Sequence, residues 1–256
     1  MTTVAAYSII GKKNTNGEIM LRLKDITYSV ESDGARKQIL CGVDLDLNDG
    51  EQVIITGHNG SGKTTLAKII MGILRPDGGK VLLDGEDVTD LDVTERAKRG
   101  IAFAFQQPVR FKGLKVGDLL KVAHGGQPTR DELCSCLSEV GLCAANYIDR
   151  ELSGELSGGE MKRIEIAMTL LRKCRVSVFD EPEAGIDIWS FDGLVDAFRS
   201  LRGGNRITVL VSHQEKIMRG ADRLILLDGG RVKTVGTPDE VLKNIRGVGA
   251  CEKLRR

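Results

Sequence analysis

A glycine-rich stretch, Gly57-His58-Asn59-Gly60-Ser61-Gly62-Lys63-Thr64-Thr65, contains residue types that bind phosphate. It follows the β-branched run 53–56, short enough to be a buried strand, and precedes residues 66–71, whose apolar spacing is helical. Between a strand and a helix, glycines let backbone N–H groups point at a di- or triphosphate, and the helix start adds its positive dipole end. Lys63 would reach the β- and γ-phosphates and the Thr64 hydroxyl would ligate Mg²⁺. The predicted phosphate-binding residues are Gly57, Asn59, Gly60, Ser61, Gly62, Lys63, Thr64 and Thr65.

Two adjacent carboxylates, Asp180 and Glu181, follow the apolar run 176–179. They would stand at the carboxyl end of a buried strand, where open α/β sheets bind ligands. Phosphoryl transfer requires charge neutralisation and an oriented water more than covalent chemistry. Asp180 is suited to the Mg²⁺ shell and Glu181 to orienting or deprotonating water, whereas the alternative for both is a solvated turn.

The surrounding patterns predict one α/β nucleotide-binding unit. Alternating apolar residues at 19–30 and 38–47 indicate antiparallel strands, and residues 223–235 indicate a hairpin. Helical spacing extends from about 116 to 151. We expect a flexible tail over 1–17 and a single domain over 18–256, with a helical subdomain of about 108–172 inserted in its core.

Composition narrows the classes of partner. The 256 residues are 41% hydrophobic and 29% charged, and the net charge of +1 does not favour nucleic acid. No run approaches the roughly 18 apolar residues of a membrane span, so we expect a cytoplasmic protein that meets membranes only through a partner. The six cysteines include no C-x-x-C pair, which favours reduced thiols, although Cys134, Cys136 and Cys143 leave a metal or iron–sulfur cluster open.

The order of these features resembles the ABC ATPase family over residues of about 19–241. The matching motifs are the phosphate loop at 57–65, Gln106 after a strand, Leu156-Ser157-Gly158-Gly159-Glu160, Val178-Phe179-Asp180-Glu181, and His213 after a strand.

The resemblance implies a P-loop NTPase fold, namely an ABC nucleotide-binding domain with a RecA-like core, an antiparallel β subdomain and a helical subdomain. It also implies Mg²⁺-dependent ATP hydrolysis, with Tyr28 stacking on adenine and Gln106 touching Mg²⁺ and the attacking water. His213 would contact the γ-phosphate, and Asp187 would face another subunit. Ser157, Gly158 and Gly159 would complete the site of a second copy, so that ATP joins a homodimer and the monomer hydrolyses ATP poorly.

Two partners remain open. The transporter pattern after the glutamate is often Pro-Thr-Ser-Ala-Leu-Asp, whereas residues 182–187 here are Pro-Glu-Ala-Gly-Ile-Asp. With residues 104–109, 157–165 and 212–217, this segment is similar to the SufC family of iron–sulfur cluster assembly ATPases, in the branch that works with a single SufB-like scaffold. Pro182 departs from the serine of many SufC proteins. The alternative is a membrane permease, and the expected contact surface is 107–120, with Phe111 and Leu114.

Overall fold

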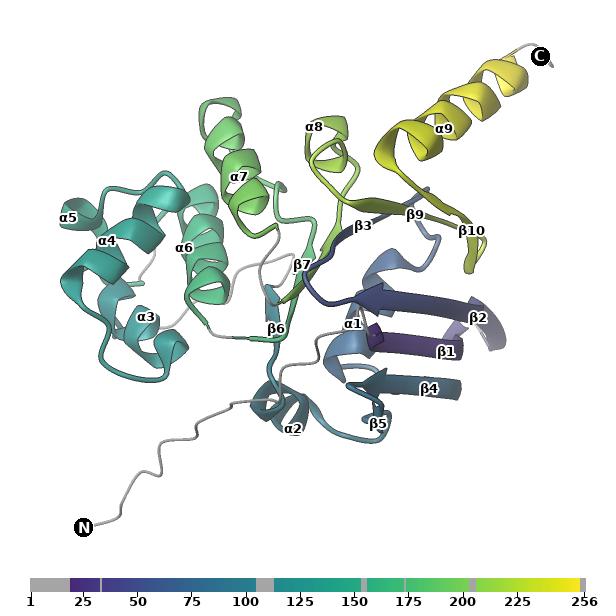
Figure 1. Ribbon diagram of the computed structural model, residues 1–256, viewed down its shortest axis with the longest axis horizontal. Coiled ribbons are helices and arrows are strands. Elements are labelled where there is room, and N and C mark those ends of the chain that lie inside the picture. Colours follow the sequence, from purple (N-terminus) through teal and green to yellow (C-terminus); the bar gives the residue numbers. More distant parts are fainter. Residues whose placement is uncertain are drawn as a thin grey trace.

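Two sheets with helices around them form the molecule (Figure 1). The computed structural model describes residues 19–32, 34–104, 113–152, 156–172, 174–202 and 206–253. The strands are β1 (Ile19–Ser32), β2 (Ala35–Asn48), β3 (Gln52–Thr56), β4 (Gly78–Leu83), β5 (Glu86–Asp87), β6 (Ile101–Ala104), β7 (Val176–Asp180), β8 (Ile207–Val211), β9 (Arg223–Asp228) and β10 (Arg231–Gly236). The helices are α1 (Lys63–Met71), α2 (Val93–Lys98), α3 (Val116–His124), α4 (Arg130–Glu139), α5 (Ala144–Tyr147), α6 (Gly158–Leu171), α7 (Ile188–Ser200), α8 (Glu215–Met218) and α9 (Pro238–Lys253).

The six-stranded sheet has the order β10-β9-β3-β8-β7-β6, and its strands from β9 to β6 run parallel. Every residue of β3, β7 and β8 is buried, as expected for apolar strands covered on both faces. Because parallel strands end at the same edge, this edge receives the glycine-rich loop after β3, Asp180 and Glu181 at the end of β7, and His213 after β8.

The four-stranded antiparallel sheet has the order β2-β1-β4-β5 and shares a hydrophobic core with α1 and the parallel sheet. Tyr28 of β1 pairs with Leu40 of β2. The β4 strand begins at Gly78, where the sequence predicts a turn up to residue 80, because Gly78 and Lys80 already pair with β1. Glycine is uncommon in strands, so Gly78 and Gly79 made this stretch look like a turn from the sequence.

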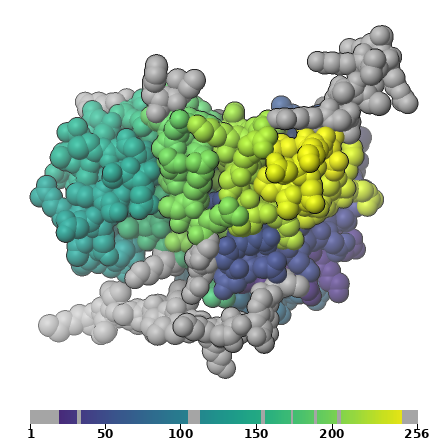
Figure 2. All heavy atoms as spheres, turned by 45° about the horizontal axis from the view of Figure 1, so that its top comes forward, coloured from purple at the N-terminus to yellow at the C-terminus, as the bar shows by residue number. Residues whose placement is uncertain are grey.

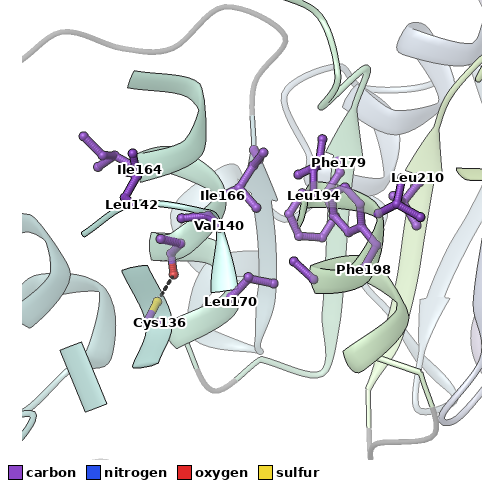
Figure 3. Close-up of a cluster of buried hydrophobic side chains, with 14 of the residues drawn as sticks. Cys136, Val140, Leu142, Ile164, Ile166, Leu170, Phe179, Leu194, Phe198 and Leu210 are labelled. Carbon is purple, nitrogen blue, oxygen red and sulfur yellow. Dashed lines mark hydrogen bonds between the residues drawn. The ribbon is translucent and has the colours of Figure 1, made fainter. Parts of the chain in front are cut away.

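Helices α3, α4, α5 and α6 gather at one end of the molecule, away from α9 at the other end (Figures 1 and 2). Their core continues to Phe179 of β7 and Phe198 of α7, whose rings meet edge to face with centroids 5.0 Å apart (Figure 3). Cys136 lies in this core, where its thiol donates to the carbonyl oxygen of Ala167. The α/β fold class is confirmed, whereas the boundaries of the tail and the helical subdomain stay predictions, since residues 1–18 and 105–112 lie outside the described residues.

Candidate nucleotide-binding site

The glycine-rich loop depends on backbone conformations that side chains disfavour. Gly57 has φ 148°, and a Cβ there would lie 2.0 Å from the carbonyl oxygen of Leu227. Gly62 caps α1 at φ 100°, and its Cβ would lie 2.6 Å from Leu40 Cδ2. The glycines therefore let the loop pack against β9 and β2 while it turns into α1.

Lys63, the first residue of α1, lies over the loop with 5% of its surface exposed. Its ammonium donates to the carbonyl oxygens of Gly57 and His58, each at 2.9 Å. Burial lowers the pKa of Lys63, and the negative charges of Glu181 and Asp180 oppose that shift. A partly desolvated cation at a helix start suits a phosphate anion.

Ser61 supplies a direct test of whether the loop fits a phosphate. Its hydroxyl oxygen is buried and has no hydrogen-bond partner among the described residues. Buried hydroxyls normally have a partner, so this one is an open donor within the loop. The loop thus offers a donor and a cation that match an anionic group.

Thr64 and Asp180 meet where α1 begins and β7 ends. The Thr64 hydroxyl donates to Asp180 Oδ1 at 3.1 Å, and Asp180 is 1% exposed. Burial raises the pKa of Asp180, while the Thr64 hydrogen bond lowers it. A hydroxyl and a carboxylate are hard oxygen ligands of the kind Mg²⁺ prefers, so the pair fits this ion.

Glu181 and His213 follow the adjacent strands β7 and β8. Glu181 Oε1 lies 3.7 Å from His213 Nε2, and the Glu181 backbone N–H donates to Val211 O at 2.9 Å. Glu181 adopts φ 46°, an uncommon conformation for a non-glycine residue. Burial and the charge of Lys63 lower the pKa of His213, so its imidazole is neutral at pH 7.

Ser157, Gly158 and Gly159 form the start of α6. Ser157 caps the helix by accepting from the Glu160 N–H at 3.2 Å, and the Glu160 carboxylate accepts from the Ser157 N–H at 2.7 Å. The Tyr147 hydroxyl also donates to Glu160. These contacts build the capping box within one helix and its neighbour, and they do not connect the motif to the phosphate loop.

The other predicted site residues lie in three places. Tyr28 of β1 is half-buried and pairs with Leu40 of β2, whose side chain lies beside Gly62, so Tyr28 stands one strand away from the phosphate loop. Asp187 is exposed and caps α7 through Ser190. Gln106 lies outside the described residues.

A link behind the site was not predicted from the sequence. The Ser212 hydroxyl donates to Glu183 Oε1 at 2.6 Å, and the Gln214 N–H donates to the Ser212 oxygen at 3.1 Å. Burial raises the pKa of Glu183, and the Ser212 bond opposes this. The position of Ser212 directly before His213 was the available signal.

A family model described as ABC transporter matches residues 40–184, more than half of the chain. The chain belongs to the ABC transporter family of ATP-binding domains. It is 37% identical to an uncharacterized ABC transporter ATP-binding protein of Methanocaldococcus jannaschii, over 80% of this chain and 85% of that protein. It is 31% identical to a probable ATP-dependent transporter of Synechocystis, over 78% and 82%.

Longer relatives and solved structures agree with this family. The chain is 34% identical to a sulfate/thiosulfate import ATP-binding protein of Caulobacter vibrioides over 83% of its own residues, but it spans only 64% of that protein. A dimeric post-hydrolysis ATP-binding cassette bound to ADP and Pi has a TM-score of 0.76 at 25% identity, covering 86% of this chain and 99% of the other.

Among the described residues, no helix is both long and apolar enough to cross a bilayer.

Proposed function

We propose that this ABC protein hydrolyses ATP with Mg²⁺ at the carboxyl edge of the parallel sheet. The observation that carries the proposal is the meeting of two pairs beside the glycine-rich loop, Thr64 with Asp180 and Glu181 with His213. The bound Mg²⁺ would neutralise phosphate charge, held by Thr64 and Asp180, with Gln106 as the predicted third ligand. Tyr28 is the candidate for stacking on adenine.

The chain's own groups divide the remaining work. Lys63 supplies a fixed positive charge to the phosphates, and the unpartnered Ser61 hydroxyl donates to them. Glu181 accepts a proton from the attacking water, because its carboxylate lies at the carboxyl end of β7, beside His213 and close to the phosphate loop. Neutral His213 donates a hydrogen bond toward the γ-phosphate from beside Glu181.

The active form we propose is a homodimer joined by ATP. Ser157 caps α6 and Asp187 caps α7, and neither contact reaches the phosphate loop of the same chain, so we place Ser157, Gly158, Gly159 and Asp187 at the nucleotide of a second copy. The dimeric cassette with ADP and Pi, similar over 86% of this chain, supports this arrangement.

A membrane permease is the partner that the relatives' names support better. The relatives from Methanocaldococcus jannaschii and Synechocystis are both described as transporter components. Neither name gives a substrate, and the sulfate/thiosulfate protein extends well beyond this chain, so no substrate is carried over. Leu114, 39% exposed at the start of the helical block, is a candidate contact. Phe111 lies outside the described residues.

A soluble SufB-like scaffold for iron–sulfur cluster assembly is the second candidate, favoured by the segment 182–187. Glu183, one of the residues in this segment that differ from the transporter pattern, lies at the site. Its carboxylate accepts a hydrogen bond from the Ser212 hydroxyl at 2.6 Å, next to His213. Glu183 Oε2 is buried as well. Glu183, which stands where the transporter pattern has Thr, is therefore part of the packed structure near Glu181. A buried, hydrogen-bonded difference of this kind supports a separate functional class better than a difference at an exposed residue would.

The test begins with the catalytic assignment. Glu181→Gln should bind ATP and accumulate as a dimer without hydrolysis, whereas Lys63→Ala should lose nucleotide binding. Glu86→Gln, at an exposed residue of β5, is the matched control and should behave like wild type. Wild-type hydrolysis by Glu181→Gln would refute its role as the base, and binding by Lys63→Ala would refute the phosphate loop.

The partner is then identified with the trapped dimer. Tagged Glu181→Gln protein with ATP is used to capture proteins from the native cytosol and from detergent-solubilised membranes, followed by mass spectrometry. A polytopic membrane protein would establish transport. A SufB-like scaffold from the cytosol would establish assembly and exclude the permease.

A further inference from the structure

One face of α6 lies against the segment that leads into α7. Gly159 and Arg163 are four residues apart and therefore share a face of the helix. A Cβ on Gly159 would lie 3.0 Å from the carbonyl oxygen of Gly185, and the Arg163 side chain reaches Ser190. The start of α6 and residues 185–190 are thus in direct contact.

A chain of hydrogen bonds joins the two elements. Arg163 Nη1 donates to Ser190 Oγ at 2.7 Å, and the same hydroxyl donates to Asp187 Oδ2 at 2.9 Å. The Ser190 N–H donates separately to Asp187 Oδ1 at 3.0 Å. The hydroxyl therefore stands between a cation and an anion, where hydrogen bonds are stronger than between neutral groups.

The surroundings strengthen this link. Arg163 is half-buried, and its Nε is buried without a partner among the described residues, so the bond from Nη1 to Ser190 is the guanidinium's described side-chain hydrogen bond. The Ser190 bond lowers the pKa of Asp187, and the charge of Arg163 contributes, so the acceptor is ionised.

We propose that Arg163 and Ser190 are positioning residues that hold the start of α6 and Asp187 together as one unit facing the second copy. The inference rests on the proposed ATP-joined dimer, in which Ser157 to Gly159 and Asp187 both act across the interface. Without the link, each would have to be ordered separately when the dimer closes, and that ordering opposes association. The phosphate loop of the same chain has no part in the link.

Ser190→Ala is the selective test, because it removes the bridging hydroxyl but keeps the backbone N–H that Asp187 caps. Ser190→Thr retains a hydroxyl and should restore function. Asp196→Asn, in an exposed ion pair on the same helix α7, is the matched control. Each is made in the Glu181→Gln background, and sedimentation with ATP gives the dimer dissociation constant. Titration with a fluorescent ATP analogue at low protein concentration gives the affinity of single chains.

We expect Ser190→Ala to raise the dimer dissociation constant about tenfold, the effect of losing one hydrogen bond to a charged group. Single-chain affinity for the analogue should stay within about twofold, since the loop is unchanged, and Arg163→Met should weaken the dimer similarly. Ser190→Thr and Asp196→Asn should match the parent.

The outcomes separate this inference from the function on which it rests. If Glu181→Gln alone forms no dimer with ATP, the proposed dimer is wrong. If that parent dimerises and Ser190→Ala dimerises equally well, the positioning role is refuted. Equal losses of dimerisation and single-chain affinity would also overturn it, because a general structural defect would explain both.

Discussion

Arg96 should be among the most sensitive residues for stability. It is fully buried, and its guanidinium donates only to backbone carbonyls among its described contacts: Ile69 at 2.6 Å, Ile70 at 2.8 Å, Thr89 at 2.9 Å and Leu91 at 3.2 Å. Ile69 and Ile70 belong to the last turn of α1, whose carbonyls lack the N–H four residues on that pairs with a carbonyl in the middle of a helix. Burial lowers the pKa of Arg96 to about 10, so it remains charged at neutral pH.

Arg96→Met keeps much of the apolar stem but removes every donor. The Ile69 oxygen still accepts from the Gly72 N–H, so three carbonyls depend on Arg96. Leaving a buried acceptor unpaired costs about 1–3 kcal/mol, and with partial rehydration we expect a loss of about 4 kcal/mol. Unfolding in urea, monitored by circular dichroism, gives the difference.

The control is Arg99→Met, which alters an exposed arginine just after α2 and should change stability by less than about 0.5 kcal/mol. Saturating ATP should raise the stability of wild type and Arg96→Met by the same increment, about 2.7 kcal/mol at 100 times the dissociation constant. A loss below about 1.5 kcal/mol in Arg96→Met would refute the reasoning, since it would mean that the carbonyls find other partners.

Three further predictions concern the loop, the histidine and the cysteines. Gly62→Ala should weaken binding of a fluorescent ATP analogue at least about tenfold and more than Gly60→Ala, which meets open space; equal affinities would contradict the packing argument. The pKa of His213 is lowered from 6.5 in the folded protein, so on acidification the unfolded chain takes up the proton first. Wild type should therefore lose stability relative to His213→Gln as the pH falls from 6.5 to the folded pKa of His213. Above pH 6.5 the difference in stability between the two proteins should stay constant. Urea unfolding across this range measures it, and the opposite slope would contradict the sign. Burial raises the pKa of the Cys136 thiol to about 12, whereas Cys143 is exposed. Maleimide should therefore label Cys143 in the folded protein and Cys136 only after denaturation, as followed by mass spectrometry. Labelling of Cys136 in the folded protein would contradict its burial in a closed core.

Local patterns predicted much of the fold. The apolar runs at 53–56, 176–179 and 207–211 are buried parallel strands, because continuous apolar sequence suits a sheet covered on both faces. The glycine-rich stretch joins strand β3 to helix α1, as its flanks predicted, and its residues 63–65 already belong to the helix. The structure also brings His213 within 3.7 Å of Glu181, which follows from strands β7 and β8 being neighbours. The catalytic and binding roles of these residues stay predictions.

Contacts between distant segments were not predictable in the same way. Arg96 lies in a six-residue helix whose composition suggests a solvated surface, and its burial depends on carbonyls 26 and 27 residues away. Helix α8 has four residues, too few for a periodic pattern to appear. Ser190 looks like an ordinary helix-start serine until Arg163 is brought beside it by the packing of α6.

The segment 182–187 shows why such contacts matter for function. Glu183 is tied to Ser212, next to His213, while Asp187 at the other end is tied through Ser190 to α6. Residues 183–187 therefore connect the strand end that we expect to face the γ-phosphate with the helix that we place across the dimer interface. We expect a change at residues 183–186 to alter how the two are coupled while leaving every predicted nucleotide and Mg²⁺ ligand in place. We therefore expect variants of residues 183–186 to change the coupling between ATP hydrolysis and the partner more than they change nucleotide binding.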